Sequence, residues 1–239
     1  MSLSTLAMPC IAYPTNPSLP PEVSALQARL AAKTKEPQGA MATELMQNAA
    51  SELLDTLFTE LFNALVAANE NEHSYRSGRA MVREINEKLT HYLGWASSFF
   101  SNDRIRPAVE HYAGMMHELS TADGAQPFIA FTCPPALAAR VEALLPDLQA
   151  AQASSPHEAI EVLIEVIDVA MKELLITPKK LMKFNFVVDK TLSGVISLMQ
   201  TAAYRSLRKI ADHLPAEHQP ILAAHMQRLV RTQAMASAA

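Results

Sequence analysis

The pattern of hydrophobic and polar positions along this chain is typical of a helical protein. Its clearest part runs from Ser155 to Leu214, where we predict two long helices that meet at Thr177 and Pro178. Ser155 is a suitable helix cap, and Glu158 three residues later fits a capping box. In the first helix the apolar residues recur at spacings of three and four, which places them on one face: Ile160, Leu163, Ile164, Ile167, Met171, Leu174 and Leu175.

The second of these helices is predicted to begin at Pro178 and to continue to Asp212, at about 1.5 Å per residue. A proline is tolerated at this position because the first turn of a helix has no hydrogen bond to lose. The first half of the helix is apolar on more than one side, as expected of an element that lies between other helices. We therefore predict a central position for this half, whose apolar residues are Leu181, Met182, Phe184, Phe186, Val187 and Val188. With Leu163 and Ile167 of the first helix, Phe184 and Val188 are predicted to lie in the core of the protein.

The same periodicity predicts helices in most of the remaining chain, namely from residue 21, over about 41–69, 75–100 and 107–120, from 135 until Pro146 interrupts it, and from 221. Residues 126–135 are apolar but closed by prolines, so we interpret them as an extended buried connector. The predicted fold class is all-α: a bundle of about seven or eight helices with a long central C-terminal helix. Residues 21–233 form the helical domain, with 21–125 and 135–233 as two possible halves, and 234–239 form a disordered tail.

Residues 1–20 contain Pro9, Pro14, Pro17 and Pro20 with serine and threonine between them and no charged side chain. This composition predicts a flexible arm that is dispensable for folding. It also resembles the uncleaved export signals of bacterial type III secretion substrates. That resemblance implies an exported effector or translocation component, secreted without a cleaved signal peptide.

Composition excludes several classes of protein. Nearly half of the 239 residues are hydrophobic, at 49%, which is enough for a substantial core. The net charge of −4 argues against bulk nucleic-acid binding, which needs many cations. A run of about 18 apolar residues is lacking, so we expect no membrane span, while peripheral membrane contact stays open. Cys10 and Cys133 lie far apart without metal or redox spacing, which favours free thiols and a cytoplasmic location.

Catalytic and cofactor motifs were sought and not found. The sequence has no glycine-rich phosphate loop, no nucleophile elbow and no zinc-binding His-Glu-x-x-His helix. Only Glu70 and His73 have the spacing of a di-iron ligand pair, and a di-iron bundle needs several such ligands. We therefore predict no catalytic, cofactor or metal site, and we interpret the chain as non-enzymatic, although a triad of distant residues stays open.

The charges are unevenly distributed, and they give the candidate binding residues. Between residues 107 and 170 nine acids face a single Arg140, whereas cations dominate from residue 171 onward. Lys179, Lys180 and Lys183 stand in the first turns of the predicted second helix, where the helix dipole disfavours cations. They either bind a partner or contact the carbonyl end of the preceding helix. Arg76, Arg79 and Arg83 are expected to pair with the acidic helix before them.

The leading functional hypothesis is an adaptor or regulatory protein that binds another protein, or a second copy of itself, through charged and apolar helix faces. The exported effector is one alternative. A helical bundle that holds a hydrophobic small molecule is the other.

Overall fold

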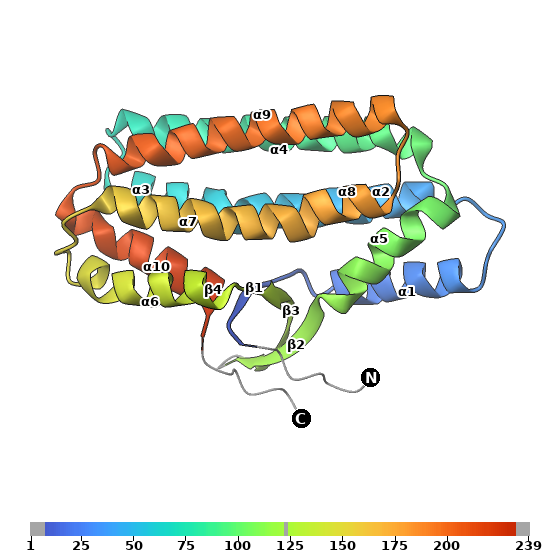
Figure 1. Cartoon of the computed structure of the whole chain (residues 1–239), viewed down its shortest axis with the longest axis horizontal. Helices are drawn as coiled ribbons and strands as arrows, with labels where there is room; N and C mark the ends of the chain where they lie inside the picture. Colours follow the sequence, from blue (N-terminus) through green and yellow to red (C-terminus); the bar gives the residue numbers. More distant parts are fainter. Residues whose placement is uncertain (1–7, 122–123, 233–239) are drawn as a thin grey trace.

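Eight helical rods and a small antiparallel sheet make up the structure, a computed structural model that describes residues 8–121 and 124–232 (Figure 1). This confirms the predicted all-α bundle. In chain order the rods are α1 (Leu19–Ala31), α2 (Gly39–Leu54) continued by α3 (Glu60–Ala68), α4 (His73–Ala96), α5 (Asn102–Gly114), α6 (Pro135–Gln149), α7 (Pro156–Met171) continued by α8 (Thr177–Leu181), α9 (Phe186–Ala211) and α10 (Gln219–Leu229). Two of them pass through a π-helical turn, at Asp55–Thr59 and at Lys172–Ile176.

The rods are arranged in three layers (Figure 1). α4 and α9 lie side by side and form one outer layer. The rods α2–α3 and α7–α8 form the middle layer, and α1, α5, α6, α10 and the sheet form the third. α9 packs against both α4 and α7, and α2 packs against α4, so the outer layer closes over the middle one.

One continuous hydrophobic core joins these layers. A single cluster of buried side chains extends from Ile11 to Val230 and includes Leu53, Leu163 and Leu207. Because its members come from residues 21–125 and from 135–233 alike, the two predicted halves share one core. None of the helices in the described residues has the length and apolar character needed to cross a membrane.

The sheet has the strand order β2-β3-β1-β4 and is antiparallel throughout. Its strands are β1 (Cys10–Pro14), β2 (Met116–Thr121), β3 (Gly124–Thr132) and β4 (Val230–Arg231). β1 is an interior strand, since Ile11 lies opposite Phe131 on one side and opposite Val230 on the other. The sheet therefore joins a segment near each end of the chain to its middle.

The sheet corrects two sequence predictions and refines a third. The arm predicted for residues 1–20 is wrong for 10–14, which form β1 with Ile11, Ala12 and Tyr13 fully buried, and for 19–20, which begin α1. The helix predicted over 107–120 is correct as far as Gly114, but α5 begins earlier, at Asn102, and residues 116–120 belong to β2. The connector at 126–135 is extended as predicted but is mostly strand β3. Residues 1–7 and 234–239 lie outside the described residues.

The boundary between the two long C-terminal helices also differs from the prediction. Thr177 and Pro178 lie within one continuous rod, which ends near Met182. A proline inside a helix leaves the carbonyl four residues earlier without its N–H donor. Here that carbonyl belongs to Leu174, and the hydroxyl of Tyr112 in α5 donates to it. The rod therefore continues past the proline because a neighbouring helix replaces the missing hydrogen bond. Pro146 likewise lies inside α6 and does not interrupt it.

The long helix α9 begins eight residues later than predicted. Lys183 has a φ of 48°, which ends the preceding rod, and the Asn185 side chain accepts a 3.0 Å hydrogen bond from the Val188 N–H as the new cap. This later start turns Phe186 and Val187 outward, so the prediction that this stretch is covered on more than one side is wrong for these two residues.

The predicted core positions lie largely as expected. Leu163, Ile167 and Val188 are buried, as predicted. Phe184 is half-buried and stacks on Phe100, with 6.0 Å between ring centroids.

Candidate functional site

The three lysines predicted to bind a partner do not share one exposed surface. Lys179 is only 9% exposed, and its Nζ lies 2.5 Å from a carboxylate oxygen of Asp189 and 2.7 Å from the hydroxyl of Ser193. This ion pair joins α8 to α9, so Lys179 has a structural role. Lys180 and Lys183 are exposed. The helix does not begin at Pro178, so the argument that the dipole disfavours these cations no longer applies.

The two helices of the outer layer, α4 and α9, run in opposite directions. Ala96 at the end of α4 packs with Val188 at the start of α9. At the other end, the hydroxyl of Tyr75 lies 3.0 Å from Nδ1 of His218, shortly after α9. The two helices are therefore antiparallel, and residues near the start of α4 lie beside residues near the end of α9.

Cations gather at the end of this layer where α4 begins and α9 ends. Arg76, Arg79 and Arg83 are exposed and follow one another along α4 at spacings of three and four. Arg205 and Lys209 are exposed one turn apart on α9. None of the five makes an ion pair within the part of the chain that the structure describes. We call these five residues the cationic end.

The arginines of α4 were expected to pair with the acidic helix before them, and this prediction is wrong. The buried face of α4 carries Tyr75, Gly78 and Val82, whereas the arginines follow its exposed side. The acidic rod finds another partner, since Glu60 pairs with Arg228 of α10.

Apolar side chains lie at the opposite end of the same layer and in its middle. Phe186 is 75% exposed, Val187 68% and Leu198 64%, although all three belong to a helix whose other face is buried. Trp95 at the end of α4 is partly exposed and contacts Phe99 edge to face. We call Trp95, Phe186, Val187 and Leu198 the apolar end.

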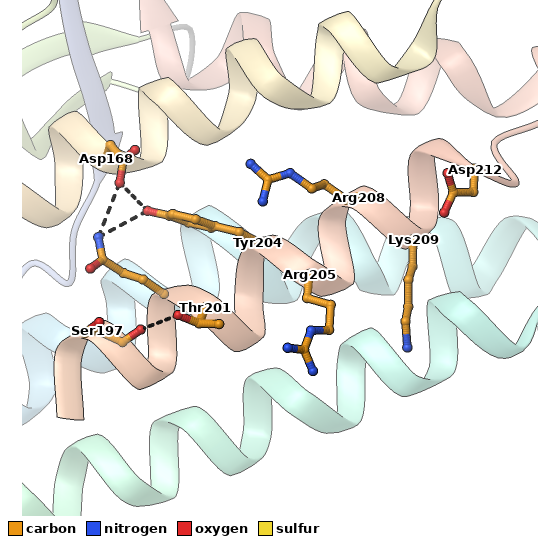
Figure 2. A pocket seen from close by; sticks show the side chains of 9 residues that line it. Asp168, Ser197, Thr201, Tyr204, Arg205, Arg208, Lys209 and Asp212 are labelled. Carbon is orange, nitrogen blue, oxygen red and sulfur yellow. Dashed lines mark hydrogen bonds between the residues drawn. The ribbon is translucent and has the colours of Figure 1, made fainter. Parts of the chain in front are cut away.

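A polar groove of about 640 Å³ runs along α9 on the side of α7. Its lining consists of Asp168, Ser197, Gln200, Thr201, Tyr204, Arg205, Arg208, Lys209 and Asp212. Figure 2 shows Tyr204 and Arg208 extending toward α7, whereas Arg205 and Lys209 point to the side of α4. The groove and the cationic end therefore share the C-terminal half of α9.

Internal hydrogen bonds occupy the α7 side of this groove. The Asp168 carboxylate accepts hydrogen bonds from the hydroxyl of Tyr204 and, at 3.2 Å, from the amide of Gln200 (Figure 2). Arg208 forms a two-pronged pair with Glu161 at 2.6 and 2.9 Å, and this hydrogen bonding lowers the pKa of Glu161. Arg205 and Lys209, in contrast, make no ion pair among the described residues.

Tyr204 is not poised for catalysis. Burial, with a further contribution from its hydrogen bond to Asp168, raises the pKa of the Tyr204 hydroxyl well above its ordinary value. The group stays protonated at neutral pH and acts as a hydrogen-bond donor. No group of three or more potential metal ligands occurs among residues 8–121 and 124–232. The groove thus offers recognition by charge and hydrogen bonding and presents no activated nucleophile.

An apolar cavity lies between α4, α8 and α9, and it is small. Its volume is about 40 Å³, and its lining includes Leu89, Phe100, Met182 and Leu192. Pockets for drug-sized ligands hold roughly 300 to 1,000 Å³. The cavity as folded therefore has no room for the hydrophobic ligand considered from the sequence.

Neither the cationic end nor the apolar end of the outer layer was predicted from the sequence as a binding surface, and the reasons can be identified. The spacing of Arg76, Arg79 and Arg83 was a usable signal, and it was assigned to an internal salt-bridge role. Phe186 and Val187 were predicted to be covered by other helices because the cap at Asn185 was not recognised. Comparison with known proteins adds no constraint, because no family model, curated protein or solved structure matches this chain.

Proposed function

We propose that this protein is a non-enzymatic helical adaptor that binds another protein through the outer face of α4 and α9. The observation that carries the proposal is the exposure of Phe186, Val187 and Leu198 on one helix, at 64 to 75% each. Large apolar side chains gathered on one face mark interaction sites when polar or charged residues border them. Here the exposed cations Arg205 and Lys209 follow Leu198 along the same helix.

The chemistry of the face supports binding. Its cationic end carries four arginines and a lysine, and arginine and aromatic side chains are enriched where proteins bind one another. Leu198 lies between Val187 and Arg205 along α9, so one partner can contact all three. We keep the cytoplasm as the proposed compartment. The exported-effector alternative rests on composition alone, and no feature of the structure favours it.

Site-specific photo-crosslinking in the native host tests this proposal. A photoreactive amino acid at Leu198 should give one defined adduct. The same probe at Ala139, which is exposed on α6 in the opposite layer, should give none.

A variant with Phe186, Val187 and Leu198 each changed to serine should lose capture of the partner identified in that adduct. Its unfolding midpoint should stay close to that of the unmodified protein, because the three side chains are mostly exposed. The same adducts from both probe positions, or undiminished capture by the triple variant, would contradict the proposal.

A further inference from the structure

We infer that the turn between α8 and α9 attaches this protein reversibly to a membrane surface that contains anionic lipids. Two exposed apolar residues and three exposed lysines lie together there, and their juxtaposition carries the inference: Phe186, Val187, Lys180, Lys183 and Lys190. We call residues 180–190 the elbow. The inference goes beyond the proposed function, because the occupant of the elbow is lipid and not a protein.

The elbow lies at one end of the bundle, on the right in Figure 1, with its apolar side chains outward. Lys183, with its φ of 48°, ends the rod formed by α7 and α8, and α9 begins three residues later. Between them Phe184 holds the turn in place, because its ring stacks on Phe100. Phe186 and Val187 come directly after this anchor and are mostly exposed. The turn therefore presents two large apolar side chains at a fixed position.

Lysines surround these two apolar side chains. Nζ of Lys190 lies 5.7 Å from the centre of the Phe186 ring. Lys180 and Lys183 precede the ring by six and by three positions, and neither makes an ion pair among the described residues. Segments that bind at a membrane interface bury apolar side chains at the boundary of headgroups and acyl chains, while their lysines extend to the lipid phosphates. The elbow has both components.

A second connection brings more lysines to the same end of the molecule. Residues 32–38 join α1 to α2 there (Figure 1). The side-chain amide of Asn102, at the start of α5, donates to two carbonyls of this connection. Two residues further along α5, the Arg104 guanidinium lies 5.6 Å from the centre of the Phe184 ring in the elbow. The start of α5 therefore holds the connection and the elbow at one end of the bundle.

Positive charge dominates these two segments. Together they carry five exposed lysines, Lys33, Lys35, Lys180, Lys183 and Lys190, and a single exposed acid, Glu36. The carboxylate of Asp189 in the elbow is paired with the buried Lys179. Clustered lysines are attracted to an anionic bilayer within about one Debye length of its surface, roughly 8 to 10 Å. Charge attraction and the two apolar side chains thus supply the two signals that membrane attachment needs.

The kind of cation favours lipid over a protein segment as the occupant. Protein interfaces are enriched in arginine and depleted of lysine. Attraction to an anionic lipid surface needs only positive charge near the surface, and lysine provides it as well as arginine does. All exposed cations of the elbow are lysines. A turn at the end of the bundle can also enter the headgroup layer of a flat bilayer without a complementary pocket.

Vesicle co-sedimentation with the full chain tests the inference. One set of vesicles contains phosphatidylcholine mixed with phosphatidylserine, and the other contains phosphatidylcholine alone. We expect saturable binding to the mixed vesicles and binding at least roughly tenfold weaker to the neutral ones. Binding to the mixed vesicles should also weaken roughly tenfold when salt rises from about 50 to about 300 mM.

Charge reversal in the elbow, with a matched reversal elsewhere, tests the lysines. The triple variant Lys180→Glu, Lys183→Glu and Lys190→Glu should bind the mixed vesicles at least roughly tenfold more weakly. The control makes the same change of charge at the cationic end and should stay within about twofold: Arg76→Glu, Arg79→Glu and Lys209→Glu. Circular dichroism checks the fold, and glutamine replaces glutamate in the elbow if the reversal unfolds the chain.

An environment-sensitive dye tests whether the apolar side chains enter the lipid. The dye is attached to Val187→Cys, since Cys10 and Cys133 are buried and the introduced thiol is exposed. Its emission should shift to the blue on addition of mixed vesicles. The same dye at Ala139→Cys, exposed on α6 in the opposite layer, should not shift.

Several outcomes overturn the inference. They are equal binding to both kinds of vesicle, equal weakening by the control reversal, and an unshifted dye at position 187. Saturable binding of a glutamate-rich peptide without binding to mixed vesicles also overturns it, and assigns the elbow to an acidic protein segment.

The test is independent of the proposed function. Leu198 lies eleven positions after Val187 on α9, so the lipid and the protein partner contact successive parts of the helix. Leu198→Ser should leave binding to mixed vesicles within about twofold. The photo-adduct at position 198 reports on the protein partner whatever the vesicles show.

Discussion

At the scale of single residues, His225 shows how one buried side chain makes the fold sensitive to pH. Its Nε2 lies 3.2 Å from the carbonyl of Leu57, so this nitrogen carries the proton. Its Nδ1 accepts from Arg228 at 3.2 Å. Burial lowers the pKa of His225 to about 4, against an ordinary value of 6.5, although the bond to Leu57 opposes this.

We therefore predict that the free energy of unfolding falls as the pH drops from 6.5 toward 4. In that window the unfolded chain binds a proton that the folded chain excludes, so protonation favours unfolding. The full effect is roughly 3 kcal/mol. Urea unfolding at several pH values should show a shallower slope for His225→Gln than for the unmodified protein. His91→Gln, at an exposed site, should leave the slope unchanged. An unchanged slope for His225→Gln would show that another group is responsible.

Replacing Gly78 with alanine should destabilise the protein, whereas replacing a glycine inside a helix with alanine usually stabilises it. A Cβ added there would lie 1.8 Å from Cε1 of Phe62, which is fully buried. We expect Gly78→Ala to cost about 1 to 3 kcal/mol through overpacking. Gly194→Ala is the control, because nothing lies within 4 Å of its added Cβ and helix propensity should stabilise that variant by about 1 kcal/mol. Chemical denaturation measures both, and a stabilised Gly78→Ala would refute the close packing.

At the scale of elements, side chains from neighbouring helices support both π-helical turns. Tyr112 donates to Leu174, and Nε2 of His111 lies 2.8 Å from the carbonyl of Glu173, both in the turn at 172–176. In the other turn His225 bonds to Leu57. Widened turns leave carbonyls without their regular partner, so each π-helical turn depends on a tertiary contact.

Tyr112→Phe should accordingly destabilise the protein by about 1 to 3 kcal/mol, since it leaves a buried carbonyl without a donor while the ring still fits. Tyr92→Phe, which removes a hydroxyl outside the core, should change stability by less than about 0.5 kcal/mol. Thermal melts of the two variants provide the comparison. Equal melting temperatures would mean that water replaces the lost bond.

The elements differ in how far the sequence could predict them. The start of α7 was predictable, because Ser155, Pro156 and Glu158 are local signals and the Ser155 side chain caps the helix as expected. The passage through Pro178 was not, because it depends on Tyr112, which lies far away in the sequence. β1 was missed for a similar reason, since its partners β3 and β4 come from distant segments.

The candidate site could likewise be predicted from the sequence only where the signal is local. The excess of cations after residue 171 was visible in the sequence, but the ion pair of the buried Lys179 with Asp189 is revealed only by the folded chain. The cationic end consists of residues from α4 and α9 that lie at the same end of the outer layer because these helices pack antiparallel. The periodicity of hydrophobic residues within one segment does not predict which other helix that segment packs against.

At the scale of the whole molecule, the shared core predicts a single cooperative unfolding transition. α4 packs on α9, α5 on α8 and α3 on α10, so contacts cross between residues 21–125 and 135–233 at several places. We expect calorimetry of the full chain to show one peak with agreement between calorimetric and van't Hoff enthalpies. Residues 21–125 or 135–233 expressed alone should show no cooperative melt. A separate sharp transition for either half would contradict a common core.

The interior position of β1 also has a consequence for the order of events during synthesis. The ribosome makes Cys10 early, but its partner Thr132 follows 122 residues later and its partner Arg231 follows 221 residues later. At about 5 to 20 residues per second, one edge of this strand waits roughly ten to forty seconds for β4. An apolar strand with unpaired backbone groups is open to aggregation during that interval. Nascent chains should therefore rely on chaperones until the last helix and strand have emerged.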